Sequence, residues 1–235
     1  MKLKTNLHFH TADDKEDSIP YSFEEALNEA VRLGFSCIAL TCHNTYAYTA
    51  ERAREAGTRG VLLIPGIERT VERKHILILN CDDDILSVHT FQALAAYKKT
   101  HPDIFVIAPH PYLGDSRSFS LGGRLEEHIS IFDAVEQTWF YSSAYNPNKK
   151  AAKTANRHSL PLIATSDTHQ LRWLNASYAE IGVKEKTIPA VFDAIRKRNF
   201  KNVSSPRSLL FEMTPYVACH AAAYYFSLLT KTFMR

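Results

Sequence analysis

The sequence predicts a single α/β domain in which strands and helices alternate, which is the pattern of a β/α barrel. Short runs of β-forming residues alternate with helical stretches about seven times along the chain. The chain has 235 residues, a length at which single-domain α/β barrels are common, and no Pro- or Gly-rich linker divides it. We therefore expect one domain over residues 1–235, in which residues 207–235 form a C-terminal extension with a packed helix.

The individual elements follow from local patterns. The expected strands are residues 3–8, 36–41, 61–65, 75–80, 104–108, 132–136 and 161–165. The first helix has Ser22 as its N-cap and Glu25 three residues later, followed by an apolar stripe that ends at Gly34. The other expected helices are residues 46–56, 87–100, 125–130, 144–158 and 188–198.

The composition argues against two classes of protein. The formal charge of +3 does not indicate a dedicated nucleic-acid-binding surface, because such proteins usually have a clustered basic face. The most apolar stretch, residues 216–229, is shorter than the roughly 18 residues of a membrane span. We expect this stretch to form the packed C-terminal helix, with membrane contact or a dimer interface as less favoured alternatives.

The four cysteines indicate a reducing compartment. They lie far apart, form no CxxC pair, and occupy positions 37, 42, 81 and 219. Free buried thiols are typical of such a compartment. Because the first residues also lack the apolar stretch of a signal peptide, we expect a cytoplasmic protein. The sequence does not indicate an oligomeric state.

Histidines and carboxylates gather at the ends of the predicted strands. Those that follow a strand are His8, His10, His43, Glu68, His110, Asp167 and His169, whereas His75 opens one. In β/α barrels the carboxyl ends of the strands meet at one face, where chemistry takes place. We therefore expect these side chains to form one site. The other five histidines lie in helical or turn contexts, and we interpret them as unrelated to the site.

The spacing within two of these segments suits metal binding. Residues two apart on an extended strand point to the same face, so His8 and His10 can hold one metal ion together. The same holds for Asp167 and His169. Mixed imidazole and carboxylate ligands favour borderline divalent ions such as Zn²⁺, Mn²⁺ or Fe²⁺ over Ca²⁺. The sequence therefore predicts a divalent metal site.

Six short motifs in this order resemble the PHP (polymerase and histidinol phosphatase) family. They are Asn-Leu-His-Phe-His-Thr at 6–11, Thr-Cys-His-Asn at 41–44, Gly-Ile-Glu at 66–68, His75, His110 and Ser-Asp-Thr-His at 166–169. The resemblance spans residue 6 to about residue 200. It implies a distorted, TIM-like (β/α)7 barrel of the PHP type that binds up to three metal ions and hydrolyses phosphate esters.

The resemblance also implies three sets of metal ligands. The first set is His8, His10, Glu68 and Asp167. The second shares Glu68 and adds His75 and His110. The third is His43, His169 and an aspartate from the loop after His10. We expect two or three divalent ions in all, with Zn, Mn or Fe as the candidates.

Two positions depart from the family pattern. Lys15 stands where the family has the aspartate of the third set, so we choose Asp14 as this ligand, with Asp13 and Asp17 as alternatives. Cys42 stands where the family has an aspartate before the histidine of the second motif. We interpret Cys42 as a small buried thiol, with a reactive or metal-bound thiolate as the alternative.

The expected reaction is hydrolysis of a phosphate ester by a hydroxide that bridges two metal ions near Glu68, without a covalent intermediate. We name Glu68, Asp167 and His169 as the catalytic residues. Candidate contacts to the phosphate are Arg69, Lys74, Arg117 and Arg172, and a solvated surface position is at least as good an interpretation of each. The substrate would be a nucleotide, a short oligonucleotide or another phosphorylated metabolite.

Two features bear on the shape of the site. Only 34 residues separate His75 from His110, so we expect no large helical cap and a fairly open site. Trp139, Phe140 and Tyr141 follow the sixth strand, where they either stack on a base or sugar or pack beneath the loop.

Three other functions stay open. Histidinol-phosphate phosphatase belongs to the same superfamily, although that branch is usually somewhat longer. A non-catalytic, metal-stabilised module is the second alternative, although such domains lose ligands that this chain retains. A non-phosphate metallohydrolase with a related barrel is the third.

Overall fold

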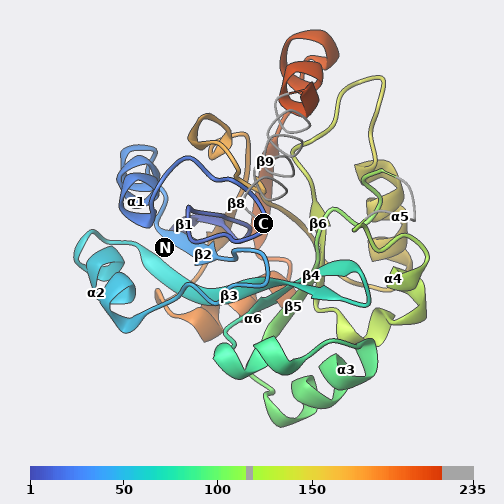
Figure 1. Ribbon diagram of the computed structural model, residues 1–235, viewed down its shortest axis with the longest axis horizontal. Helices are drawn as coiled ribbons and strands as arrows, with labels where there is room; N and C mark the ends of the chain where they lie inside the picture. Colours follow the sequence, from blue (N-terminus) through green and yellow to red (C-terminus); the bar gives the residue numbers. More distant parts are fainter. Residues whose placement is uncertain (115–118, 219–235) are drawn as a thin grey trace, which may run out of the picture.

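The computed structural model describes residues 1–114 and 119–218, and its centre is one curved sheet surrounded by helices (Figure 1). The strands are β1 Lys2–Asn6, β2 Cys37–Leu40, β3 Leu62–Val71, β4 Lys74–Leu79, β5 Phe105–Ala108, β6 Ala134–Gln137, β7 Leu162–Ala164, β8 Ser177–Gly182 and β9 Phe200–Ser204. Their spatial order is β7-β6-β5-β4-β3-β2-β1-β8-β9. The sheet forms a nearly closed barrel, which confirms the predicted fold class.

The helices cover the outside and one end of this sheet. The α-helices are α1 Phe23–Arg32, α2 Ala50–Thr58, α3 Phe91–Thr100, α4 Arg124–Glu127, α5 Asn148–Arg157 and α6 Ile188–Arg196. Short 3-10 turns are η1 Asp83–Ser87, η2 Ile129–Ile131 and η3 Leu171–Trp173, and η4 Leu209–Met213 is a π-helix. The predicted capping box of α1 is present, because Ser22 and Glu25 each accept the other's backbone N–H.

The seven expected strands correspond to β1–β7, but the regular alternation of strand and helix fails between β3 and β4. These strands form an antiparallel hairpin whose turn residues, Glu72 and Arg73, have φ values of 46° and 68°. Positive φ at both positions is the conformation of a tight hairpin turn. Because β4 runs opposite to its neighbours, its first residues lie at the carboxyl edge of the parallel strands. This direction explains why His75 opens its strand and still faces the same end of the barrel.

Strands β8 and β9, which the sequence did not predict, complete the barrel. β8 pairs antiparallel with β1, and β9 pairs antiparallel with β8. Asn202 of β9 then reaches across to β7, where its side chain accepts the N–H of Ala164 at 2.9 Å and donates to the carbonyl of Leu162 at 2.8 Å. A side-chain amide therefore takes the place of backbone pairing where the barrel closes.

An apolar core fills the amino-terminal part of the barrel, and α6 closes it. Strand residues alternate between this interior and the outer layer beneath the helices, as Leu77 and Ile78 do in β4. Phe192 of α6 stacks on Phe105, the first residue of β5, with ring centroids 4.7 Å apart. Arg196 of α6 also lies over the ring of Phe105. With its amino end filled, the barrel has its polar residues at the opposite end.

The C-terminal region is described as far as residue 218. The helix expected over residues 216–229 therefore lies largely outside the described residues, as does Cys219. Within residues 1–114 and 119–218, no helix is long and apolar enough to cross a membrane. Cys37, Cys42 and Cys81 are buried free thiols.

Candidate metal centre

The candidate ligands meet at the carboxyl end of the barrel strands. His8 and His10 follow β1, His43 follows β2, Glu68 lies in β3, His110 follows β5, and Asp167 and His169 follow β7. Isolated backbone bridges hold these segments side by side, one between Phe9 and Thr168 and one between His43 and Glu68. With His75 from the antiparallel strand β4, the structure brings all eight predicted side chains into one cluster.

The carboxylate of Glu68 lies at the centre of this cluster and is completely buried. Its Oε2 atom is 2.9 Å from Nε2 of His8 and 2.9 Å from Nε2 of His43. The same oxygen lies 3.4 Å from Nε2 of His10. Three imidazoles from two different strand ends therefore share one carboxylate oxygen.

The second oxygen of Glu68 faces two further imidazoles. Oε1 lies 3.0 Å from Nδ1 of His75 and 3.1 Å from Nε2 of His110. Five imidazoles in all exceed the roughly four hydrogen bonds that one carboxylate accepts. A metal ion with bonds of about 2.1 Å separates adjacent ligand atoms by about 3.0–3.4 Å, which is close to the 2.9–3.4 Å of these contacts. The spacing fits a carboxylate that would bind a divalent metal ion together with these imidazoles.

Asp167 completes a four-residue group with His8, His10 and Glu68. Its Oδ1 atom lies 3.3 Å from Nε2 of His8 and 3.3 Å from Nε2 of His10. Although they are this close, Oδ1 of Asp167 and Nε2 of His10 have no hydrogen-bond partner among the described residues. Buried polar atoms that lie near one another without aligned hydrogen bonds suit a shared cation. The donor set therefore fits a divalent ion.

Two of the site residues have unusual backbone conformations. Asp167 has a φ of 44° and His110 a φ of 26°, in the left-handed region that side chains other than glycine rarely adopt. Such conformations persist where the surrounding structure fixes them, and they gather at functional sites. At these strand ends they turn the two side chains towards Glu68.

Two overlapping groups extend the cluster beyond the first. One consists of His43, Glu68 and His75, and the other of His10, His43 and His169. His43 belongs to both, and its ring lies between those of His10 at 4.4 Å and His75 at 4.9 Å. The three groups therefore form one continuous cluster.

The three aspartates of the loop after His10 have different partners. Oδ2 of Asp14 lies 3.0 Å from Nδ1 of His10 and 2.9 Å from Nδ1 of His43. Asp17 lies beside His169, with Oδ2 2.9 Å from Nε2. Asp13 faces away and pairs with Arg52. The structure thus places both Asp14 and Asp17 at the cluster, and Asp13 outside it.

Glu136 is a buried carboxylate of the site that sequence reasoning missed. Its Oε2 atom lies 3.0 Å from Nδ1 of His8 and accepts the backbone N–H of His110 at 3.2 Å. A carboxylate on the far nitrogen of a metal-binding imidazole fixes the tautomer and orientation of the ring. The signal in the sequence was a glutamate at the carboxyl end of an expected strand.

Charge is balanced within the cluster by raised imidazole pKa values. Burial and the charge of His169 oppose protonation of His10, but nearby carboxylates, first among them Asp14, raise its pKa to about 9. Burial likewise opposes protonation of His43, whose pKa the charge of Glu68 raises to about 9. Burial also disfavours a charged Glu68, yet the surrounding imidazoles hold its pKa well below the usual range. Protons on these imidazoles therefore compensate the negative charge of the carboxylates, as bound divalent cations would.

Cys42 has the surroundings of an inert thiol. It is completely buried, and its sulfur lies 3.5 Å from the hydroxyl of Thr11. Burial raises the pKa of this thiol to about 11, so it stays protonated at neutral pH. None of the metal-binding groups among the described residues includes it. These surroundings agree with the interpretation of Cys42 as a small buried thiol.

The arginines proposed to contact phosphate have different surroundings. The guanidinium of Arg69 is largely buried and donates to the carbonyls of Val88 and Leu86, which ties it to the neighbouring loop. Arg117 lies outside the described residues. Arg172 lies over the ring of Trp173. Of the described pair, Arg69 has the contacts of a structural residue.

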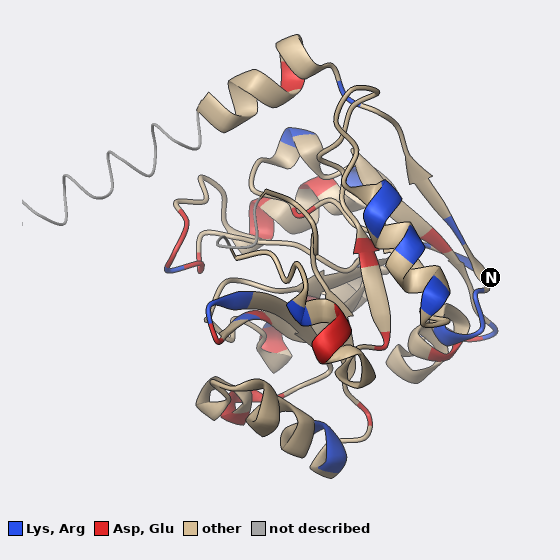
Figure 2. Ribbon diagram, turned by 90° about the vertical axis from the view of Figure 1, so that its right-hand side faces the viewer, with Lys and Arg blue, Asp and Glu red and all other residues tan. Residues whose placement is uncertain are grey.

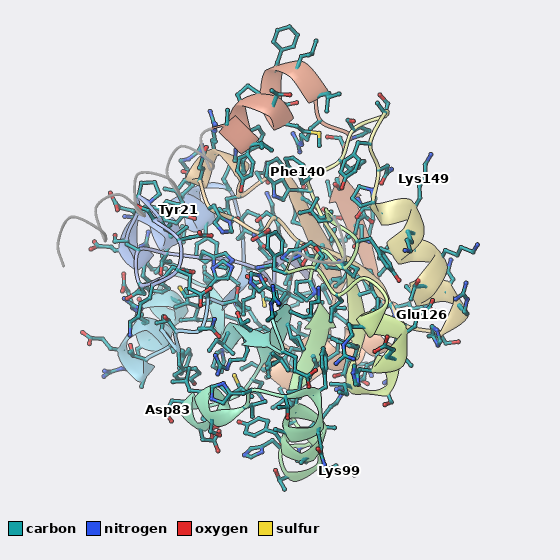
Figure 3. The ribbon with its side chains drawn as sticks, turned by 45° about the vertical axis from the view of Figure 1, so that its right-hand side comes forward. Tyr21, Asp83, Lys99, Glu126, Phe140 and Lys149 are labelled. Atoms are coloured by element: carbon teal, nitrogen blue, oxygen red, sulfur yellow. The ribbon has the colours of Figure 1, made fainter. Side chains whose placement is uncertain are left out.

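The aromatic residues after β6 pack together. Trp139 is almost fully buried and stacks on Trp173 with centroids 4.8 Å apart. Phe140, labelled in Figure 3, lies between the barrel and the segment that holds Tyr216, whose ring is 5.8 Å away. Tyr141 is also buried. These three side chains pack within the protein and do not form an open surface on which a base or sugar could stack.

Comparison with known proteins agrees with the fold. The chain resembles a two-domain protein from Bacteroides vulgatus that contains a predicted PHP-like metal-dependent phosphoesterase, with 19% identity and a TM-score of 0.62 over 87% of this chain and 65% of that one. It resembles PsfC from Pseudomonas syringae with 14% identity and a TM-score of 0.64 over 97% of this chain and 99% of that one. It also resembles the lesion-specific endonuclease PfuEndoQ from Pyrococcus furiosus, with 17% identity and a TM-score of 0.63 over 88% of this chain and 60% of that one.

The chain spans less than two thirds of the Bacteroides and Pyrococcus proteins. No curated protein sequence matches it. Residues 146–200 match the family model PHP_C, described as PHP-associated. This match covers less than half of the chain, and together with the shared barrel it agrees with the resemblance of the motifs to the PHP family.

Proposed function

We propose that this protein is a metal-dependent hydrolase of phosphate esters. The observation that carries the proposal is the buried carboxylate of Glu68, which is contacted by five imidazoles at 2.9–3.4 Å. The similar proteins add support, since one contains a predicted PHP-like phosphoesterase and another is an endonuclease. Fold likeness leaves the substrate of this chain open.

We assign the ligands to two or three divalent ions, with Zn, Mn or Fe as candidates. The first ion would be held by His8, His10, Glu68 and Asp167. The second would be held by Glu68, His75 and His110. The third would be held by His43, His169 and an aspartate of the 13–17 loop, where Asp17 and Asp14 both reach the cluster.

The chemistry of the site follows from its charge. Bound divalent ions would neutralise the phosphate and lower the pKa of a water molecule. The protein supplies the geometry: Glu68 holds the two halves of the cluster together, and Glu136 and Asp14 fix the far nitrogens of His8 and His10. Asp167 and His169 remain the other candidate catalytic residues.

The exposure of the side chains supports a direction from which a substrate would reach the cluster. The side chains of His8, His10 and Glu68 are fully buried. Those of Asp167 and His75 are 15% and 14% exposed. A phosphate group would therefore reach the cluster where the side chain of Asp167 or that of His75 meets solvent.

The surface beside the site suits an anionic substrate. Helix α5 carries four basic residues and no acidic one, at positions 149, 150, 153 and 157, and Figure 2 shows them spaced along the helix. Lys150 lies over the ring of Tyr112, two residues beyond His110, which connects this helix to the rim of the site. A short oligonucleotide therefore remains a candidate beside a mononucleotide or another small phosphate ester. The cytoplasmic location stays a prediction.

Phosphate release from a panel of esters tests the proposal. The panel includes a nucleoside monophosphate, a short oligonucleotide and histidinol phosphate, each with and without added Mn²⁺. We expect Mn²⁺-stimulated hydrolysis that falls by about a hundredfold or more in Asp167→Asn. The control, Asp193→Asn, changes an exposed surface carboxylate that pairs with Lys197 and should keep the parent rate.

Other outcomes would point to the alternatives. Hydrolysis of histidinol phosphate alone would assign that narrower activity. A folded Asp167→Asn variant that matches the parent rate would favour a structural metal site, and absence of hydrolysis with every ester would contradict the proposal.

A further inference from the structure

Phe119 lies beside His75 and His110 of the second ligand set, although a phenylalanine side chain cannot bind a metal ion. Its backbone carbonyl accepts the N–H of His75 at 2.9 Å. Its ring stacks on the imidazole of His75, with centroids 4.9 Å apart and planes 21° apart. It also meets the ring of His110 edge-on at 5.3 Å. Phe119 is therefore fixed one ring away from the carboxylate of Glu68.

The ring of Phe119 is also open to solvent. The residue is 44% exposed, whereas the two residues that follow it, Ser120 and Leu121, are buried. A bound molecule that covers this ring would remove apolar surface from water, which is favourable. Phe119 is therefore a large, exposed hydrophobic residue that contacts a candidate metal ligand.

The location of the ring matches the direction in which a substrate would leave the cluster. A phosphate bound where the side chain of His75 meets solvent would lie beside the ring that stacks on His75. That ring belongs to Phe119. An aromatic face suits a flat π-system, because stacking on it is favourable for every nucleobase and gives little advantage to a small aliphatic group.

We propose that Phe119 stacks on the organic group of the substrate, so that the site prefers phosphate esters of flat aromatic groups, such as nucleosides, over esters of small aliphatic alcohols. This inference rests on the proposed phosphoesterase function. Phe119 would select the substrate, whereas the residues of the cluster would bind the metal ions.

Steady-state kinetics with two esters test the inference. Phosphate release is measured from a nucleoside monophosphate and from glycerol phosphate, with the metal content of each variant determined alongside. In Phe119→Ala we expect the KM for the nucleotide to rise about tenfold, with kcat and the KM for glycerol phosphate unchanged. Phe119→Trp should restore the low KM. The control, Phe211→Ala, removes a phenylalanine that is 84% exposed on η4 and should change neither ester.

A structural role for Phe119 would give another pattern. Loss of a cover over His75 would lower the metal content and kcat for both esters. Phe119→Leu keeps an apolar cover but lacks the aromatic face, so under our proposal it binds metal normally and still shows the raised KM for the nucleotide. Equal changes for both esters, or none for either, would overturn the inference while the parent enzyme stays active. A parent protein inactive on both esters would instead count against the proposed function.

Discussion

Replacing Glu136 by glutamine tests whether a buried carboxylate behind the ligands tunes the metal site. Oε2 of Glu136 lies 3.0 Å from Nδ1 of His8 and accepts the N–H of His110 at 3.2 Å. The amide oxygen of glutamine can keep both contacts. The substitution therefore removes a negative charge behind His8 while it preserves size and shape.

The expected magnitude follows from the two ends of the glutamate. Loss of a carboxylate that orients a metal-binding imidazole lowers metal affinity by about 10- to 100-fold, or about 1.4–2.7 kcal/mol. The new NH₂ group would occupy the place of Oε1, a buried atom without a hydrogen-bond partner among the described residues. An unsatisfied buried donor costs about 1–3 kcal/mol of folding stability. We expect both effects in Glu136→Gln.

Competition with a chelating dye measures the affinity for Mn²⁺, and urea unfolding in EDTA measures the stability. The control, Asp133→Asn, changes a carboxylate just before the same strand, at the opposite end of the barrel. Asp133 pairs with Lys98 at 2.7 Å and accepts the N–H of Val106, so its loss should lower stability and leave metal affinity unchanged. Metal affinity in Glu136→Gln within about twofold of the parent would refute the reasoning, as would an equal loss in the control.

Three further predictions concern pH, metal count and closure of the barrel. The pKa values of His10 and His43 are about 9 and that of His169 is about 10, all above the ordinary value of 6.5. Protonation of these three imidazoles therefore stabilises the metal-free protein fully below pH 6.5, and this stabilisation is lost as the pH rises through 9 to 10. The melting temperature in EDTA should therefore fall between pH 6.5 and 10; a rise would contradict this balance of charge. Asp17→Asn should lower the metal content by one ion per chain in elemental analysis, whereas Asp13→Asn should not, and equal counts would exclude Asp17 as a ligand. Asn202→Ala should cost about 1–3 kcal/mol in urea unfolding, because Leu162 and Ala164 lose their partner; an unchanged midpoint would show that the barrel closes without it.

The positions of the main site residues could be predicted because chain direction sets them. Residues at the carboxyl ends of parallel strands share one face whatever the details of packing. His43 and His110 reach the cluster for this reason. His75 was predicted from the family resemblance and not from chain direction, because a strand's direction depends on a turn, and Glu72 and Arg73 include no glycine that would indicate one.

Other features depend on contacts between distant segments. Glu136 belongs to the site because its oxygen meets His8, more than a hundred positions earlier in the chain. Arg69 was predicted as a phosphate contact from its place beside Glu68, and only the structure reveals that its guanidinium donates to carbonyls of the next loop. Strand β8 alternates buried and half-buried residues, a pattern too short to separate from a loop without its partner β1.

Metal analysis of crystals tests the central claim most directly. The protein would be purified without chelator, supplied with Mn²⁺, and examined by anomalous diffraction together with elemental analysis. The account predicts two or three ions per chain, one of them surrounded by His8, His10, Glu68 and Asp167. A well-ordered cluster that contains no ion in the presence of Mn²⁺ would contradict it.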